Sequence, residues 1–255
     1  ITGEIDVFEH AHSLDERARR AGIVLCPGVG FDVVATDCLA AILQEALPNA
    51  TYLALGFDTR GRPSPGTART MLRGLATGGR IRSAGRLLEV PLTFRARAID
   101  FGRGTVDAMT IAWGDVSTAF YTTGIPNIEV YVPMSRGAVR RLRLARLARP
   151  LVQLAPVREM LERRIVASVH GPGEAARANT PVHVWGEARD PQGAVRVARM
   201  RTANGYTFTR HAATGILREM TERPHAPGFA TPSMLVGSGY AASLPGSSAP
   251  RISES

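Results

Sequence analysis

The sequence predicts an α/β protein, in which the end of a parallel-sheet domain is followed by an α+β domain with a mixed, largely antiparallel sheet. A short apolar run at 23–26 lies between two helix-like segments, as is typical of a strand buried in a parallel sheet. From residue 88 onward, β-rich runs separated by Gly, Pro and Asp dominate. At 255 residues, 44% of them hydrophobic, the chain is long enough to bury the core of one or two domains.

The first 48 residues alternate between helix and strand signals. A helix is expected at 13–21, with Ser13 as its N-cap. The apolar run at 23–26 follows, and a second helix is expected from 33 to 47, where Pro48 stops it. This alternation is typical of α/β domains, and it predicts that residues 1–48 close a Rossmann-like sheet.

The remaining sequence predicts an α+β domain over residues 49–227. Strands are expected at 52–58, 88–98, 105–113, 117–122, 128–132, 180–187 and 194–202, and helices at 65–75 and 206–220. Residues 101–104 and 190–193 have the composition of hairpin turns. Residues 228–243 are expected to return toward the first domain, and residues 244–255 to form a disordered tail.

The composition excludes several classes of function. The net charge is +9, but every basic residue is Arg, whereas a nucleic-acid-binding face normally mixes Lys with Arg. We therefore expect no nucleic acid as partner. Cys26 and Cys38 fit no zinc or redox spacing and are expected to be buried free thiols in a reducing, cytoplasmic setting. No apolar run approaches the length of a transmembrane helix.

One block, residues 139–166, is unusually basic. It carries eight arginines among leucines and valines, and two prolines interrupt it. One interpretation is a helix packed by its leucine side on the sheet, with a solvated arginine face. The other is a basic amphipathic surface for peripheral contact with a membrane or a protein partner.

Several motifs occur in a characteristic order along the chain. ITGE at 1–4 precedes GVGFDVVATD at 28–37, PSPGTARTML at 63–72, and a long run beginning HGPGEAARANTPVHVWGEARD at 170–190. Together these motifs resemble the saccharopine dehydrogenase-like oxidoreductases. The run GEARD…GY…TR…PGFATPS is most similar to the trans-acting enoyl reductase branch. Ala35 is a departure, because the family usually has Pro at that position.

The resemblance implies a nicotinamide cofactor, NADP or NAD, bound by a Rossmann-like domain of which residues 1–48 would be the C-terminal part. The chain starts inside a motif and lacks the Gly-rich loop for the pyrophosphate. We therefore expect an N-terminally truncated enzyme, inactive as this fragment alone. The implied reaction is hydride transfer to an imine, carbonyl or enoyl group of a small-molecule or acyl substrate, and a homodimer is a further expectation.

The first candidate site comprises two strand-end turns. Ligands of open α/β sheets bind at the carboxyl ends of the strands, so both turns should face the cofactor. Gly3 and Gly30 would allow close approach of backbone, Phe31 would pack beside the nicotinamide ring, and Glu4 would bond its amide or ribose. Asp32 is the candidate catalytic carboxylate, although it could also simply cap the following helix.

The second candidate site lies in the HGPGEAAR segment. His170 could transfer a proton near neutral pH, and Arg177 could bind a carboxylate or acyl group of the substrate. A lone histidine in a loop is more often structural. The His10-Ala11-His12 pair lacks a third ligand, so no metal site is expected. A rival hypothesis is a non-enzymatic, membrane-peripheral or partner-binding protein that retains the fold.

Overall fold

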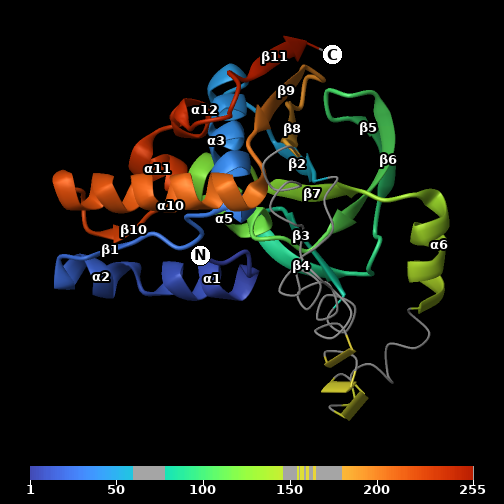
Figure 1. The fold of residues 1–255 in the computed structure, drawn as a ribbon, viewed down its shortest axis with the longest axis horizontal. Helices are drawn as coiled ribbons and strands as arrows, with labels where there is room; N and C mark the ends of the chain where they lie inside the picture. The colour runs from blue at the N-terminus through green and yellow to red at the C-terminus, as the bar shows by residue number, and fades with distance from the viewer. Residues whose placement is uncertain are drawn as a thin grey trace.

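The computed structural model describes residues 1–59, 78–145, 154, 156–157, 159–160, 163–164 and 180–254. In these residues, helices from both ends of the chain gather against one side of a large sheet (Figure 1). The helix predicted at 65–75 lies outside the described residues.

The large sheet is mixed and largely antiparallel, as predicted. Its main path runs in the order β11-β9-β8-β2-β7-β3-β4, and β6 joins β7 and carries β5. Within the described residues, β2 and β7 form its only parallel pair. Its strands are β2 Tyr52–Asp58, β3 Gly79–Ser83, β4 Arg86–Val90, β5 Ala96–Asp100, β6 Thr105–Ile111, β7 Asn127–Pro133, β8 Val182–Arg189, β9 Val195–Thr202 and β11 Arg251–Glu254.

Strand β2 is the centre of the sheet and is buried on both faces. Leu53 and Leu55 contribute to the main core under the helices, whereas Ala54 belongs to a second cluster on the opposite face. At Gly56, an added Cβ would lie 2.6 Å from the carbonyl oxygen of Tyr131 and 3.1 Å from the Phe101 ring. Gly56 therefore gives Phe101, at the end of β5, room to fold over the sheet.

Helix α3, Phe31–Ala46, is the most deeply buried helix of the described chain, because apolar or small residues occupy nearly its whole circumference. It contacts β8 closely at Gly186, where an added Cβ would lie 2.6 Å from Leu43. The other helices are α1 Ile5–Ser13, α2 Asp15–Ala21, α5 Asp115–Thr123, α6 Arg136–Ala145, α10 Gly205–Glu222, α11 Pro232–Val236 and α12 Tyr240–Ser243. None of the helices in the described part of the chain has both the length and the hydrophobicity needed to cross a membrane.

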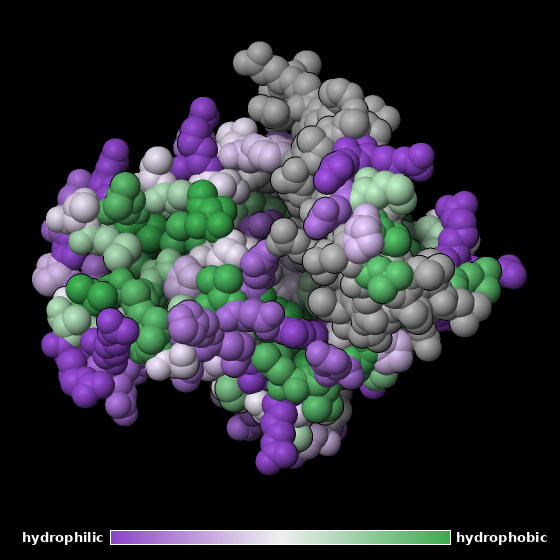
Figure 2. Space-filling view, turned by 90° about the horizontal axis from the view of Figure 1, so that it is seen from below, coloured by the Kyte–Doolittle hydropathy of each residue, from purple (hydrophilic) through white to green (hydrophobic). Residues whose placement is uncertain are grey.

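A second, two-stranded sheet joins the beginning of the chain to its C-terminal part. Strand β1, Val24–Leu25, pairs in parallel with β10, Gly228–Phe229. The carboxylate of Asp15 in α2 holds β10 by accepting a 2.6 Å hydrogen bond from the Phe229 N–H. Hydrophobic side chains are exposed on this side of the molecule, which Figure 2 views from below. In residues 1–24, the exposed large hydrophobic side chains are Ile1, Val7 and Ile23.

Three local predictions were wrong. The single strand predicted at 88–98 is two strands, since β4 ends at Val90 and β5 begins at Ala96. Residues 117–122, predicted as a strand, lie in helix α5, where Val116 and Ala119 face the core and Gly124 ends the helix at φ 71°. The β-branched and aromatic residues of this segment favour a strand, but packing against the core stabilises a helix instead. Ser13 is not an N-cap: it is the last residue of α1, and its hydroxyl donates to the His10 carbonyl at 2.7 Å.

The predicted disordered tail differs from the structure, and the predicted division into domains stays open. The tail predicted to be disordered includes β11, which pairs antiparallel with β9, and Glu254 forms an ion pair with Arg196 at 2.8 Å. Helix α3 shares one hydrophobic core with the large sheet, so the core continues across the proposed boundary at residue 48. The division into domains therefore stays a prediction.

Gly56→Ala should lower the free energy of unfolding by about 1–3 kcal/mol, because its methyl group must displace the Tyr131 backbone or the Phe101 ring. Gly137→Ala in α6 is a matched control, since its Cβ would meet no atom within 4 Å. The control should be neutral or stabilising by up to about 1 kcal/mol. Urea denaturation of both variants measures this, and equal stabilities would refute the packing argument.

Candidate functional site

Three segments distant in sequence meet at the N-terminus of α3. A Cβ added to Gly3 would lie 3.3 Å from the Cβ of Asp32, and one added to Gly114 would lie 3.1 Å from the Gly3 carbonyl oxygen. The Trp113 indole N–H donates to the Asp32 carbonyl at 2.8 Å. The two predicted turns, Thr2-Gly3-Glu4 and Gly30-Phe31-Asp32, are therefore neighbours, and the turn before α5 joins them.

Asp32 supplies a half-buried carboxyl group at this junction. Burial raises the pKa of this carboxyl above its ordinary value. Asp32 lies inside the first turn of α3 and does not cap it, because the N-cap residue is Gly30. Its carboxylate accepts no hydrogen bond from the described residues. Glu4, in the neighbouring turn, is exposed.

Phe31 and Gly30 are part of the protein core. The Phe31 ring is 6% exposed and lies 5.7 Å from the ring of Phe57 and 5.8 Å from that of Phe208, edge to face. A Cβ on Gly30 would lie 2.9 Å from Ile1 and 3.1 Å from Thr209. The space beside each residue is thus filled by this chain's own side chains, which leaves no room for a nicotinamide ring on Phe31.

A second carboxylate, Asp37, is fully buried one turn further along α3. Its Oδ1 accepts a hydrogen bond from the Thr122 hydroxyl at 2.5 Å, and its Oδ2 accepts one from the Ser233 N–H at 2.7 Å. Burial raises the pKa of Asp37, while these hydrogen bonds lower it. Asp37 therefore connects α3 to α5 and to the first turn of α11, beneath the junction that contains Asp32.

Glu9 and Arg82 form a polar link on the other side of α5. Arg82 is 4% exposed in its side chain and forms a 2.7 Å ion pair with Glu9. Glu9 also accepts hydrogen bonds from the hydroxyls of Ser117, at 2.6 Å, and Tyr121, at 2.9 Å. This link fixes α1 against α5, and with it the turn containing Gly3. It was not predicted, because three separate elements contribute to it.

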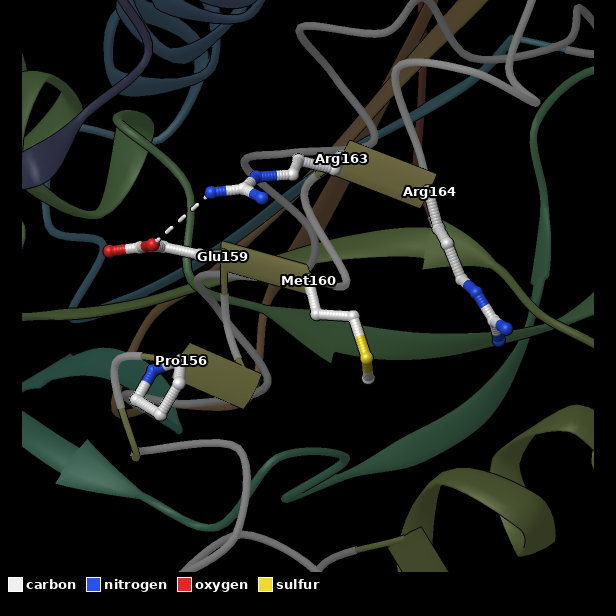
Figure 3. A pocket seen from close by; sticks show the side chains of 5 residues that line it. All are labelled: Pro156, Glu159, Met160, Arg163 and Arg164. Atoms are coloured by element: carbon white, nitrogen blue, oxygen red, sulfur yellow. Dashed lines mark ion pairs between the residues drawn. The ribbon is translucent and has the colours of Figure 1, made fainter.

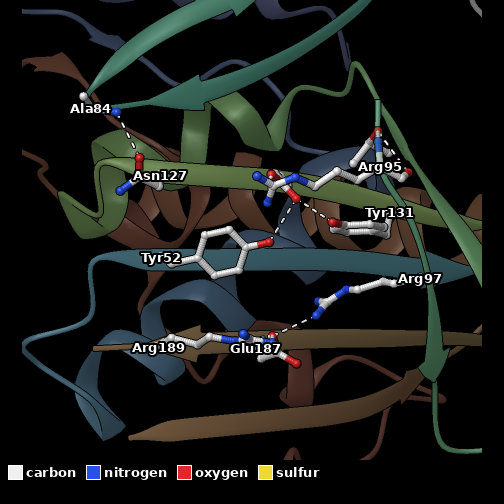
Figure 4. Close-up of polar contacts among 10 residues, drawn as sticks. Tyr52, Ala84, Arg95, Arg97, Asn127, Tyr131, Glu187 and Arg189 are labelled. Carbon is white, nitrogen blue, oxygen red and sulfur yellow. Dashed lines mark hydrogen bonds and ion pairs between the residues drawn. The ribbon is translucent and has the colours of Figure 1, made fainter. Parts of the chain in front are cut away.

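A separate polar cluster occupies the opposite face of the sheet (Figure 4). The buried carboxylate of Glu129 accepts hydrogen bonds from Tyr52 at 2.9 Å and Tyr131 at 2.5 Å. Arg95 completes the set with a 2.9 Å ion pair. Burial and the adjacent Glu129 raise the pKa of Tyr52 to about 12, so this phenol is neutral at neutral pH.

Glu187 binds the other two arginines of this cluster. It pairs with Arg97 at 2.9 Å and with Arg189 at 2.7 Å. The Arg97 guanidinium lies 4.8 Å from the ring centroids of both Tyr131 and Trp185. Its Nε and Nη2 are buried without a hydrogen-bond partner among the described residues, and these cation–π contacts compensate in part. The cluster links β5 to β7 and β8 across the face of the sheet.

The residues predicted for the second site, His170 and Arg177, lie outside the described residues. A pocket of about 360 Å³ lies nearby in sequence, lined by Pro156, Glu159, Met160, Arg163 and Arg164 (Figure 3). All five residues come from one short stretch, which lies well away from α3 (Figure 1). We assign it no role.

The turn before α3 does not form a cradle for a dinucleotide pyrophosphate. Such a site needs free N–H groups at a helix N-terminus. At α3, the Phe31 N–H already donates to the Thr209 hydroxyl at 2.9 Å, and a Cβ on Gly28 would lie 2.7 Å from the Phe8 ring. No cluster of His, Cys, Asp and Glu in the described part of the chain could hold a metal ion.

Comparisons with known proteins give a distant structural similarity. No protein-family model matches the sequence, and no curated protein matches it significantly. Among solved structures, the chain is similar to apo histidine-tagged saccharopine dehydrogenase (L-Glu forming) from Saccharomyces cerevisiae. The TM-score is 0.49 at 10% identity, over 95% of this chain and 76% of that chain. This similarity is too distant to support a conclusion about chemistry.

Glu9→Gln should lower the free energy of unfolding by about 2 kcal/mol, because it leaves the buried Arg82 without its counter-charge. Asp6→Asn is the matched control on the same helix, since its pair with Arg80 involves a largely exposed carboxylate. That change should have little effect. Thermal melts of both variants test this, and a Glu9→Gln protein as stable as Asp6→Asn would contradict the proposed link.

Proposed function

We propose that the chain is the substrate-handling part of an NAD(P)-dependent oxidoreductase related to the saccharopine dehydrogenases, which transfers hydride to an imine, carbonyl or enoyl group. The observation that carries the proposal is the meeting of Gly3, Asp32 and Gly114 at the start of α3. Two of these residues belong to the motifs on which the sequence resemblance depends. Their contact favours a shared role over coincidence.

In this proposal Asp32 exchanges a proton with the substrate. Reduction of a carbonyl, imine or enoyl group requires one proton besides the hydride. A half-buried carboxyl with a raised pKa can supply or hold that proton closer to neutral pH than a solvated aspartate can. Glu4, exposed in the adjacent turn, is a candidate for bonding the amide or ribose of the nicotinamide half.

The phosphates of the cofactor would be bound outside the described residues. At the N-terminus of α3 the Phe31 N–H already donates to Thr209, and a Cβ added at Gly28 or Gly30 would meet Phe8 or Ile1. The roles predicted for Phe31 and Gly30 are therefore not part of this proposal. The proposal keeps the predicted roles of His170 in proton transfer and of Arg177 in substrate binding. It also includes a cytoplasmic location and a homodimer.

The rival proposal is a non-enzymatic protein that binds an anionic membrane or partner through residues 139–166. Helix α6 favours it, since Arg140, Arg141 and Arg143 are exposed and Leu144 is 68% exposed. Arg140→Glu/Arg141→Glu should then abolish sedimentation with anionic vesicles while leaving neutral vesicles unbound. If the unaltered chain does not sediment with anionic vesicles at low salt, a membrane role for α6 is excluded.

The two halves of the cofactor provide the test of the oxidoreductase proposal. Reduced nicotinamide mononucleotide, which lacks the pyrophosphate bridge, should bind this chain at about millimolar concentration and perturb the amide resonances of Gly3, Glu4 and Gly114. NADPH should bind no more than about tenfold tighter, because the Phe31 N–H at the start of α3 already donates to Thr209 and is not available to its pyrophosphate.

Asp32→Ala should remove these perturbations, whereas Asp190→Ala, in the turn between β8 and β9, should retain them. Perturbations confined to other surfaces would contradict the proposed position of the nicotinamide. Low-micromolar NADPH binding would contradict the argument about the phosphates.

A further inference from the structure

Asp115, the first residue of α5, is a fully buried carboxyl that the proposed reaction does not use. It is 0% exposed, and its Oδ2 has no hydrogen-bond partner among the described residues. Its Oδ1 contacts the hydroxyl of Thr36 in α3. In the described part of the chain, no cation forms an ion pair with it. An ionised carboxylate in this position would be stabilised only by the Thr36 hydroxyl and by the backbone N–H of Asp115 itself, and a buried charge with so little compensation is costly.

The hydroxyl of Thr36 decides which group carries the proton. This oxygen lies within hydrogen-bond distance of both Asp115 Oδ1 and the Val33 carbonyl oxygen, the latter at 3.0 Å. A hydroxyl has one hydrogen and cannot donate fully to both acceptors. The conflict disappears if Asp115 donates to Thr36 and Thr36 donates to Val33. That chain needs a hydrogen on Asp115 Oδ1 and leaves Oδ2 as a carbonyl oxygen, which is the least costly atom to leave unpaired.

Asp37 is buried equally deeply, but both of its carboxylate oxygens accept hydrogen bonds from separate donors. Thr122 donates to its Oδ1, and the Ser233 N–H donates to its Oδ2. Thr231 lies 2.6 Å from Thr122 and can donate to it in turn. Each of these donors has its own hydrogen, so both oxygens of Asp37 accept as in an ionised carboxylate.

We propose that Asp115 is a carboxylic acid that remains protonated at neutral pH, and that Asp37 beside it bears the single negative charge of the pair. Asp115 is then a positioning residue. Through the chain Asp115–Thr36–Val33 it fixes the start of α5 to the first turns of α3, where Asp32 lies. This inference rests on hydrogen-bond geometry and does not depend on the oxidoreductase proposal.

The surrounding charges are consistent with a neutral Asp115. On α3, Asp32 and Asp37 are like charges that disfavour its ionisation, and burial raises its pKa well above the ordinary value. On β3, Arg82 donates to the Val116 carbonyl in the same helix, but its charge is paired with Glu9 of α1. The thiols of Cys26 and Cys38 are neutral, because burial raises the pKa of each to about 12.

The test compares Asp115→Asn with Asp37→Asn in the full chain. An asparagine side chain has the shape of a protonated aspartate. At position 115 its amide nitrogen can occupy the Oδ1 position and donate to the Thr36 hydroxyl, as the protonated carboxyl does, while its carbonyl oxygen replaces Oδ2, where no donor is displaced. At position 37 the amide must face either the Ser233 N–H or the Thr122 hydroxyl. Asp115→Asn should therefore keep or raise the Tm at neutral pH, and Asp37→Asn should lower it by about 2–8 °C.

The pH dependence gives a readout that a purely structural role would not change. The unfolded chain loses the Asp115 proton near about pH 4, whereas the folded chain keeps it to higher pH. Above about pH 4 the unfolded state thus binds fewer protons, so wild-type stability falls as the pH rises through this window. Asp115→Asn lacks this loss, and its Tm advantage over wild type should grow between about pH 4 and 8.

Infrared spectroscopy of the unaltered protein provides the decisive measurement. A protonated-carboxyl C=O band should persist at neutral pH, disappear in Asp115→Asn and remain in Asp37→Asn. This band can be sought in wild type even if a variant fails to fold. Absence of the band, or a Tm advantage of Asp115→Asn that shrinks as the pH rises, would overturn the proposal.

Discussion

The burial of α3 against the large sheet is the constraint on which the rest of the structure depends. Leu43 of α3 packs directly against the backbone of β8, which is possible only because residue 186 is a glycine and has no side chain. With the helix in that place, α5, α10, α11 and α12 can pack around it and close one core. Each of these helices then brings polar groups against a helix that is buried along most of its length. Polar side chains on the deeply buried part of α3, residues 31–43, must therefore find a partner inside the protein or become neutral.

Asp32, Thr36 and Asp37 satisfy this requirement in three ways. Asp32 lies at the rim and keeps its carboxylate half-buried. Asp37 is paired with hydroxyl and amide donors from α5 and α11. Thr36 meets a second acid, Asp115. Burial increases along α3 from Asp32 at the rim to Asp37 in the interior. One short segment can therefore contain both a partly accessible titratable carboxyl and a carboxylate fixed by hydrogen bonds.

Local pattern predicted most of the sheet but only part of the site. Strand β2 and the hairpins β5–β6 and β8–β9 have alternating or apolar runs with turn residues between them, which sequence alone reveals. Helix α5 was missed, because the β-branched and aromatic residues of Thr118–Thr123 favour a strand until Val116 and Ala119 meet the core. Asp115 was missed for a similar reason: one aspartate after a glycine suggests a turn, and only the contact with Thr36 gives it a role.

The pairing of β1 with β10 has a consequence for how the chain reaches its native state. These strands come from opposite ends of the described sequence, and α3 packs on β8 and β9, which are also made late. During synthesis the apolar surface of α3 therefore remains exposed until β8 and β9 have left the ribosome. Contacts between such distant segments slow folding and prolong the exposure of hydrophobic surface. The chain should thus fold after synthesis rather than during it, and a nascent chain that ends before β8 should depend on chaperones to remain unaggregated.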